Sequence, residues 1–167
     1  PMNPNFIIWL GRRMAYLGDY KKAIAIYTEG IEKHPKDARM YRHRGHRYIT
    51  TRQLDLAIKD FEKAVTLIQD TKDIIEPDGI PNRLNQPVSS LHTNIYYHLG
   101  LAYYLKADWP NALSNYKKCL EASTNDDMRV AASHWLYMIL QRLERPEDAN
   151  KLLEPIRFNM PIIENNV

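Results

Sequence analysis

The side chains best suited to binding chemistry are basic and crowd into one short stretch. Six of the nine consecutive positions that begin at Arg39 are Arg or His, and the nearest acidic residues on either side are Asp37 and Asp55. Arg39, Arg42 and His46 are three and four residues apart, so on a helix they share one face. Because guanidinium groups form paired hydrogen bonds with carboxylates and phosphates, this face predicts a site for an anionic group.

A second interpretation of these arginines stays open. Charged runs on exposed helix faces commonly form ion pairs with nearby acids and bind no partner. Four acids are candidates for such pairing: Asp19, Glu29, Asp55 and Asp60. The sequence is therefore compatible with a solvated basic surface, and equally with a site for an acidic peptide, a terminal carboxylate or a phosphorylated segment.

Other chemistries find little support. His43 and His46 are close enough in sequence to share a metal ion, but no strong third ligand lies near them and the arginines oppose a cation. The single cysteine, Cys119, excludes an internal disulfide and a paired-cysteine metal site, and its place in the repeat predicts a buried, unreactive thiol. No phosphate-binding loop, nucleophile elbow or glycine fingerprint occurs. We therefore expect no enzyme, no metal and no cofactor.

The basic stretch belongs to a unit with a period of about 34 residues. In each clear copy a glycine is followed twelve residues later by an alanine, and four residues after that by an aromatic residue. The copies are Gly11, Ala23 and Tyr27; Gly45, Ala57 and Phe61; and Gly100, Ala112 and Tyr116. Apolar residues at three- and four-residue steps predict two amphipathic helices per unit. A glycine inside a helix costs about 1 kcal/mol relative to alanine, which predicts the close approach of another backbone.

This pattern resembles the tetratricopeptide repeat (TPR), whose signature is an aromatic residue, Leu-Gly, Tyr, Ala, Phe and a terminal Pro. The resemblance covers most of the chain, with departures such as Met14 for tyrosine and Arg44 for leucine, and with Tyr137 in the glycine place of a degenerate fourth unit. It implies an all-α fold, a right-handed α-solenoid superhelix of about four helix-turn-helix repeats with eight helices. It also implies a concave groove that binds a peptide or partner segment.

The element boundaries follow from the same phase. We expect helices at about 5–17, 20–33, 38–50, 54–70, 89–106, 109–122, 127–143 and 146–158. Residues 1–167 should form a single array with repeats at about 4–37, 38–71, 93–126 and 130–163, and with an irregular insert at about 71–90. Pro1 and Pro161 fall in phase with Pro35, so we expect the chain to be a segment of a longer array.

The phase also predicts which side chains line the groove. The candidates are Arg12, Tyr16, Arg39, Arg42, His46, Asn94, Tyr97, Tyr104, His134, Met138 and Gln141. Arg12 should join the basic stretch, whereas Tyr97 and Tyr104 should either hold an apolar or proline-rich anchor or pack against the insert. Tyr96 and Tyr103 occupy packing positions and should belong to the core.

Some TPR relatives hold the terminal carboxylate of chaperones with a clamp of Lys, Asn and Arg. The matching places here carry Ile8, Arg12, His43, Asn94 and His98. The resemblance therefore does not extend to chaperone-tail binding.

The sequence predicts a protein-protein interaction scaffold that binds a protein or peptide partner, and the basic stretch favours an acidic partner. One alternative is a regulatory or self-associating segment of a larger enzyme or membrane-anchored protein. A homodimer is expected if the apolar C-terminal end is bare; its residues are Leu152, Leu153, Ile156, Phe158, Ile162 and Ile163. Nucleic acid is disfavoured, because the net charge is only +3 and the basic residues form no extended stripe.

The sequence places the chain in no particular compartment. It contains neither a secretory signal nor a run of roughly 18 apolar residues that would cross a membrane. We therefore expect no membrane contact from this segment, and its composition is typical of a soluble folded chain.

Overall fold

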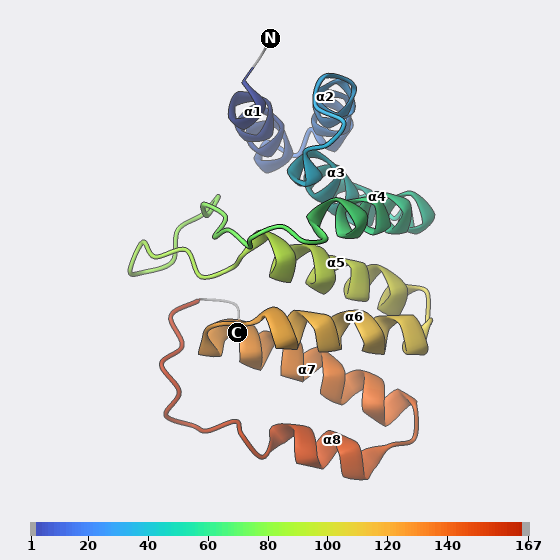
Figure 1. Ribbon diagram of the computed structural model, residues 1–167, viewed down its shortest axis with the longest axis vertical. Coiled ribbons are helices and arrows are strands. Elements are labelled where there is room, and N and C mark those ends of the chain that lie inside the picture. The colour runs from blue at the N-terminus through green and yellow to red at the C-terminus, as the bar shows by residue number, and fades with distance from the viewer. Residues whose placement is uncertain (1–2, 165–167) are drawn as a thin grey trace. The chain divides into compact units, whose positions relative to one another are not determined.

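The computed structural model describes residues 3–164, and every regular element among them is an α-helix. Residues 1–72 and 73–167 form two compact units, which are described separately below. The first contains α1 (Pro4–Tyr16), α2 (Tyr20–Lys33), α3 (Ala38–Thr50) and α4 (Leu54–Ile68); the second contains α5 (Leu91–Leu105), α6 (Trp109–Ala122), α7 (Asp126–Arg142) and α8 (Pro146–Leu153) (Figure 1). The predicted all-α class with eight helices is confirmed for these residues. Pro1, on which the expectation of a longer array partly rests, lies outside them.

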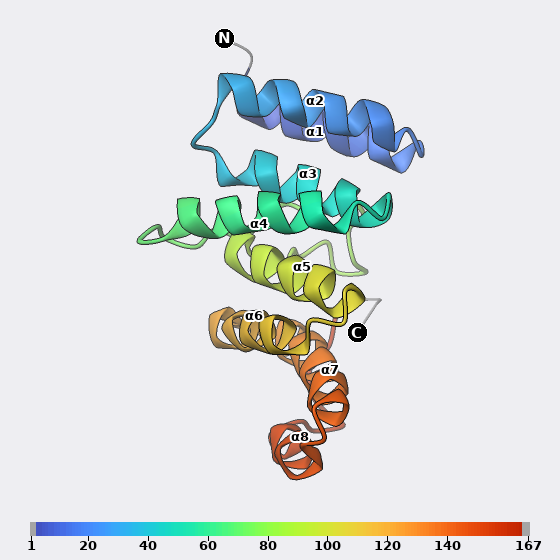
Figure 2. The ribbon, with the colours of Figure 1, turned by 90° about the vertical axis from the view of Figure 1, so that its right-hand side faces the viewer.

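In the first unit each helix packs against the next, and α1 also contacts α3. Figures 1 and 2 show α1 lying along α2, and α3 lying along α4. Ile7, Ile8 and Met40 form one buried cluster between these helices, and Ala23 and Tyr27 contribute to another. Short polar side chains fix the helix starts: the carboxylates of Asp19 and Asp37 accept hydrogen bonds from backbone N–H groups in the first turns of α2 and α3.

The glycine and the aromatic residue recur at the same spacing in each repeat because they pack directly against each other between the two helices of a pair. A Cβ atom on Gly11 would lie 2.4 Å from the Tyr27 ring, one on Gly45 would lie 2.9 Å from Phe61, and one on Gly100 would lie 2.7 Å from Tyr116. The prediction that another backbone approaches these glycines is therefore wrong, because the group in close contact is an aromatic ring of the second helix. All three rings are almost completely buried.

The second unit has its core at the interface of α5, α6 and α7. Tyr116 and Leu136 are fully buried there, and Tyr97, Tyr103 and Trp135 pack against them. Tyr96 and Tyr103, expected in the core, are half-buried. Helix α8 ends at Leu153 and not at 158, because Pro155 has no N–H to continue the helical hydrogen bonds.

The insert between α4 and α5 contains no helix, as expected, but it is tied to the start of α5. Residues 75 and 90 form an isolated antiparallel bridge, in which Glu76 N–H donates to Ser89 O and Leu91 N–H donates to Ile74 O. Ser90 caps α5 through a reciprocal pair of hydrogen bonds with Thr93, which explains why this helix begins at Leu91 and not at 89.

The segment after α8 returns along the second unit toward the start of α7 (Figure 1). The Asp127 carboxylate there accepts hydrogen bonds from the backbone N–H groups of Ile163 and Glu164, at 2.9 and 2.8 Å. Ile162 and Ile163 are half-buried as a result, whereas Phe158 is fully exposed. No helix within residues 3–164 is long and apolar enough to cross a membrane.

Candidate functional site

The first unit contains a cleft of about 140 Å³ between α1, α2 and α3. It is lined by Arg12, Ala15, Tyr16, Tyr27, Arg42, His43, His46 and Arg47. No acidic side chain is among these lining residues. Four of the predicted groove residues, Arg12, Tyr16, Arg42 and His46, are therefore brought together, and the cleft has a strongly positive lining.

The arginines of the cleft are held in place by aromatic and imidazole groups. The Arg12 guanidinium lies 4.5 Å from the centre of the Trp9 ring, and its Nε atom donates a long hydrogen bond of 3.4 Å to the Tyr16 hydroxyl. Arg42 Nη1 lies 3.1 Å from Nδ1 of His43. The His43 ring is buried and stacks on Tyr27, with ring centres 5.6 Å apart. These contacts limit the rotamers of the cationic groups before any ligand arrives.

Arg47 carries the least compensated charge in the cleft. Its guanidinium lies 5.9 Å from the Tyr20 ring centre and forms no ion pair with any residue of the range 3–164. Burial lowers the pKa of Arg47, and the positive charge of Arg42 lowers it further. A half-buried cation beside a second cation is a site that an incoming anion would stabilise.

Tyr27 also lines the cleft, and the positive charges of the cleft arginines act on its pKa. Burial raises its pKa to about 12, while Arg47, Arg42 and Arg12 each act to lower it. The hydroxyl therefore keeps its proton near neutral pH, and its proton points to the carbonyl oxygen of Ile8 over a long distance of 3.5 Å.

Two other arginines of the basic stretch have structural partners. Arg44 forms a buried ion pair with Asp60 and also donates to the Thr28 hydroxyl at 3.0 Å. Arg39, a predicted groove residue, pairs with Asp37 at 2.6 Å and donates to Asn5 Oδ1 at 2.7 Å; it does not line the cleft. The ion-pair interpretation of the basic run is thus right for these two arginines, with Asp60 among the acids expected and Asp37 not.

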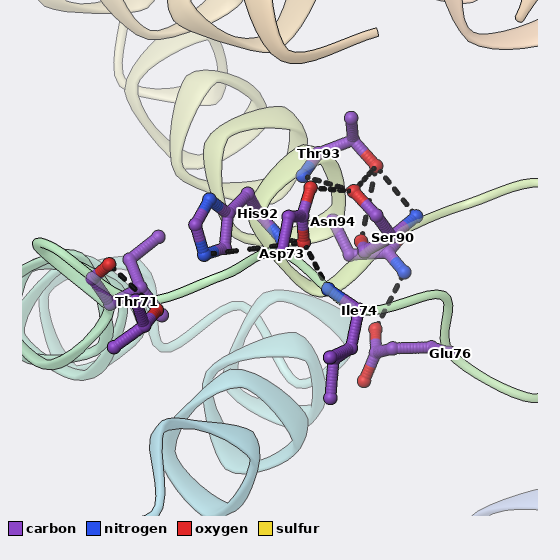
Figure 3. A network of polar contacts seen from close by, with 9 residues as sticks. Thr71, Asp73, Ile74, Glu76, Ser90, His92, Thr93 and Asn94 are labelled. Carbon is purple, nitrogen blue, oxygen red and sulfur yellow. Dashed lines mark hydrogen bonds and ion pairs between the residues drawn. The ribbon is translucent and has the colours of Figure 1, made fainter. Parts of the chain in front are cut away.

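The second unit brings together only two of its predicted groove residues. Asn94 and Tyr97 line a cavity of about 200 Å³, together with Asp78, Val88, Ser89, His98, Met128, Ala131 and Glu164. The Asn94 amide nitrogen donates to Glu76 at 2.6 Å and to Ser89 at 3.1 Å. Figure 3 shows Asn94 in the first turn of α5 and Glu76 on the neighbouring insert. Asp73, also of the insert, accepts hydrogen bonds from Ser90 Oγ at 2.5 Å and from His92 N–H at 3.0 Å.

The remaining predicted residues do not line this cavity. Tyr104 belongs to an aromatic cluster, with its ring centre 5.1 Å from that of Trp109 and 5.0 Å from that of Trp135. His134 is exposed at the edge of Trp135, Met138 is half-buried, and Gln141 is exposed. Tyr104 therefore packs within the unit, which differs from both of its expected roles.

The structure adds side chains that the helical phase did not select. Arg47 and His43 line the basic cleft, although they lie outside the face defined by Arg39, Arg42 and His46. No signal in the sequence separates Arg47 from the paired arginines, because Arg39 and Arg44 also have no acid three or four residues away. Asp78 and Glu164 come from irregular segments, where no periodicity says which way a side chain points.

The remaining chemistry-bearing residues have simple environments. The Cys119 thiol is fully buried, lies 3.5 Å from the carbonyl oxygen of Thr93, and has a pKa that burial raises to about 12. The predicted buried position is thus confirmed. Within residues 3–164 no group of three or more His, Cys, Asp or Glu side chains is arranged to hold a metal ion.

Comparison with known proteins gives a family match for one helix pair. Residues 38–71, which comprise α3 and α4 and the whole basic stretch, match the family model described as tetratricopeptide repeat. Residues 38–71 are thus similar to one tetratricopeptide repeat. The TPR resemblance expected from the glycine and aromatic spacing is confirmed, although Arg44 stands in the leucine place of the matched repeat.

Solved TPR structures have the same fold. The first TPR of Spaghetti (RPAP3), bound to the HSP90 peptide SRMEEVD, is 21% identical, with 84% of this chain and 93% of that chain covered and a TM-score of 0.67. The first TPR domain of human RPAP3 is also 21% identical, with 87% and 96% covered and a TM-score of 0.66. MamA from Desulfovibrio magneticus RS-1 is 18% identical, with 92% and 73% covered and a TM-score of 0.68. The TPR fold is generally a non-catalytic scaffold that binds proteins.

Proposed function

We propose that this TPR chain is a protein-interaction scaffold whose first unit binds an anionic group on a partner segment. The observation that carries the proposal is the cleft lined by Arg12, Arg42 and Arg47 with no acidic side chain in its lining. Arg42 and Arg47 come from one helix and Arg12 from another, so the three guanidiniums approach one small volume from two sides. Such an arrangement favours a carboxylate or phosphate group, because each guanidinium offers several N–H donors.

The composition of the cleft supports recognition and not catalysis. Its polar groups are guanidiniums, imidazoles and tyrosine hydroxyls, and no serine, threonine, cysteine or carboxylate nucleophile is among the lining residues. The only cysteine, Cys119, is buried in the other unit. We infer that the chain acts by binding and is not an enzyme.

The partner is expected to be a peptide or protein segment. The first TPR of Spaghetti (RPAP3), which has the same fold, is bound to the HSP90 peptide SRMEEVD, and this similarity supports a peptide partner for the present chain. The cleft described here is built from different side chains than the Lys, Asn and Arg clamp, since Ile8 and His43 occupy two of the clamp places. We therefore propose an acidic segment without assigning it to a chaperone tail.

A single cleft of about 140 Å³ also favours one anionic group over a long polyanion. A nucleic-acid strand would contact basic residues along an extended path, and its affinity would fall steeply with salt. Arg39 and Arg44, which would extend such a path along α3, are already paired with Asp37 and Asp60.

Selection from a peptide library tests the proposal. Wild-type protein should enrich peptides with Asp, Glu or phosphorylated residues, and a variant carrying Arg42→Glu and Arg47→Gln should lose at least tenfold in affinity for them. The matched control, Arg13→Glu with Lys36→Gln, makes the same charge change at exposed positions outside the cleft and should bind normally. Equal binding by wild type and the cleft variant, or enrichment without acidic residues, would refute the proposal.

A further inference from the structure

The cavity of the second unit differs in charge from the basic cleft. It lies where the insert, the first two turns of α5 and α7 and the segment after α8 meet, and its volume is about 200 Å³. Two carboxylates, Asp78 and Glu164, line it, and no Lys or Arg is among the lining residues. The cavity therefore has a negative lining on a chain whose net charge is positive.

The walls of this cavity are fixed by contacts within the unit. Glu164 Oε1 accepts a hydrogen bond from Asn82 Nδ2 at 2.9 Å, and the backbone N–H of Glu164 is held by Asp127. The Tyr97 hydroxyl accepts a hydrogen bond of 2.7 Å from the indole Nε1–H of Trp135, and its ring packs edge-on against Tyr116. The cavity is thus lined by groups that already have defined positions, which reduces the entropic cost of filling it.

The polar groups that line the cavity are mainly hydrogen-bond acceptors, so a matching ligand would carry hydrogen-bond donors. Asn94 uses its amide nitrogen for Glu76 and Ser89, so its carbonyl oxygen is the group left to accept. Burial raises the pKa of Tyr97, so this ring stays a neutral phenol whose face attracts cations. Carboxylates, an amide oxygen and an aromatic ring together suit a cation that carries several N–H groups.

We propose that this cavity binds one cationic side chain, arginine or lysine, of a partner segment. Pockets for drug-sized ligands measure roughly 300–1,000 Å³, so a volume of about 200 Å³ matches a single long side chain. The apolar stem would lie against Val88 and Met128, and the charged head would pair with Asp78 and Glu164. This site is separate from the basic cleft, and it replaces the apolar anchor expected beside Tyr97 with a charged one.

Trp135 provides a reporter for the experiment. Its indole N–H bonds directly to Tyr97, so filling the cavity should move its ¹⁵N–¹H resonance, which can be assigned with a Trp135→Phe variant among only three tryptophans. The probe is the peptide acetyl-Gly-Arg-Gly-amide, and its neutral counterpart has citrulline in place of arginine. We expect a saturable shift with arginine, a similar shift with lysine, and at least tenfold weaker binding of the citrulline peptide.

Two further measurements test the proposal: removal of the two cavity carboxylates by mutation, and binding of the small amine agmatine. Asp78→Asn with Glu164→Gln should weaken the arginine peptide at least tenfold, whereas Glu121→Gln with Glu147→Gln, at exposed positions, should leave it unchanged. Equal binding of the citrulline peptide, an unchanged affinity in the cavity variant, or the absence of a saturable shift would overturn the proposal. Tighter binding of free agmatine than of the peptide would overturn the assignment to a protein partner.

Discussion

Arg44 and Asp60 form a two-pronged ion pair that joins α3 to α4. Arg44 Nε lies 2.7 Å from Asp60 Oδ2, and Nη2 lies 2.8 Å from Oδ1. The two side chains are only 17% and 6% exposed. One member of the basic stretch is therefore part of the internal packing, in the leucine place of the repeat, while Arg47 three residues later faces the cleft.

Replacing Asp60 with alanine should lower the free energy of unfolding by about 3–5 kcal/mol, because the buried Arg44 charge would lose its carboxylate. Replacing Arg47 with glutamine should change it by less than about 1 kcal/mol, because no ion pair is lost. Urea unfolding followed by circular dichroism measures both values. A similar loss in the two variants would show that Arg47 is also a structural residue.

Gly45→Ala should destabilise the first unit by about 1–3 kcal/mol, although alanine favours a helix by about 1 kcal/mol. The added methyl group would lie 2.9 Å from the Phe61 ring. The ring is fully buried, so neighbouring side chains prevent it from moving away. The double variant Gly45→Ala with Phe61→Leu should lose less stability than the sum of the two single variants. Strict additivity in thermal unfolding would contradict this packing.

The stability of the chain should decrease at alkaline pH. Burial raises the pKa of Cys119 and of Tyr27 to about 12, from ordinary values of 9.0 and 10.0. The folded chain thus keeps protons that the unfolded chain releases, so this stabilisation is complete below about pH 9 and is lost as the pH rises toward 12. Each retained proton contributes a slope of about 1.4 kcal/mol per pH unit.

A Cys119→Ala variant isolates the thiol in that experiment. Its stability at neutral pH is affected by the smaller side chain, so the quantity to compare is the slope between pH 9 and 10, measured by urea unfolding. The slope should be shallower in the variant than in the wild type. An identical slope would show that the thiol ionises as readily in the folded chain as in the unfolded one.

The sequence predicts the helices because local signals are strong. The spacing of Gly45 and Phe61 marks the helix pair, and short polar caps such as Asp19 and Asp108 mark helix starts. The ends without such signals were less well predicted. Helix α8 stops at Leu153 because of Pro155, and α4 stops at Ile68, before the 70 expected.

The candidate sites were only partly predictable, because ion pairs decide which arginines line a cleft. Helical phase places Arg12 and Arg42 in one cleft, but it cannot show that Arg39 is held by Asp37 and Asn5. Asp78 and Glu164 reach their cavity through irregular backbone, for which the sequence carries no periodic signal. A charge pattern therefore locates a region, and the partners of each charge define the site.

Binding of an anionic group in the first-unit cleft can be followed at the arginine Nε–H resonances. Arginine-labelled protein would be titrated with inorganic phosphate at constant ionic strength. We predict that the signals of Arg12, Arg42 and Arg47 shift along saturating curves with one common Kd, while that of Arg44 stays fixed by Asp60. Small linear shifts of equal size at all of these arginines would contradict the account.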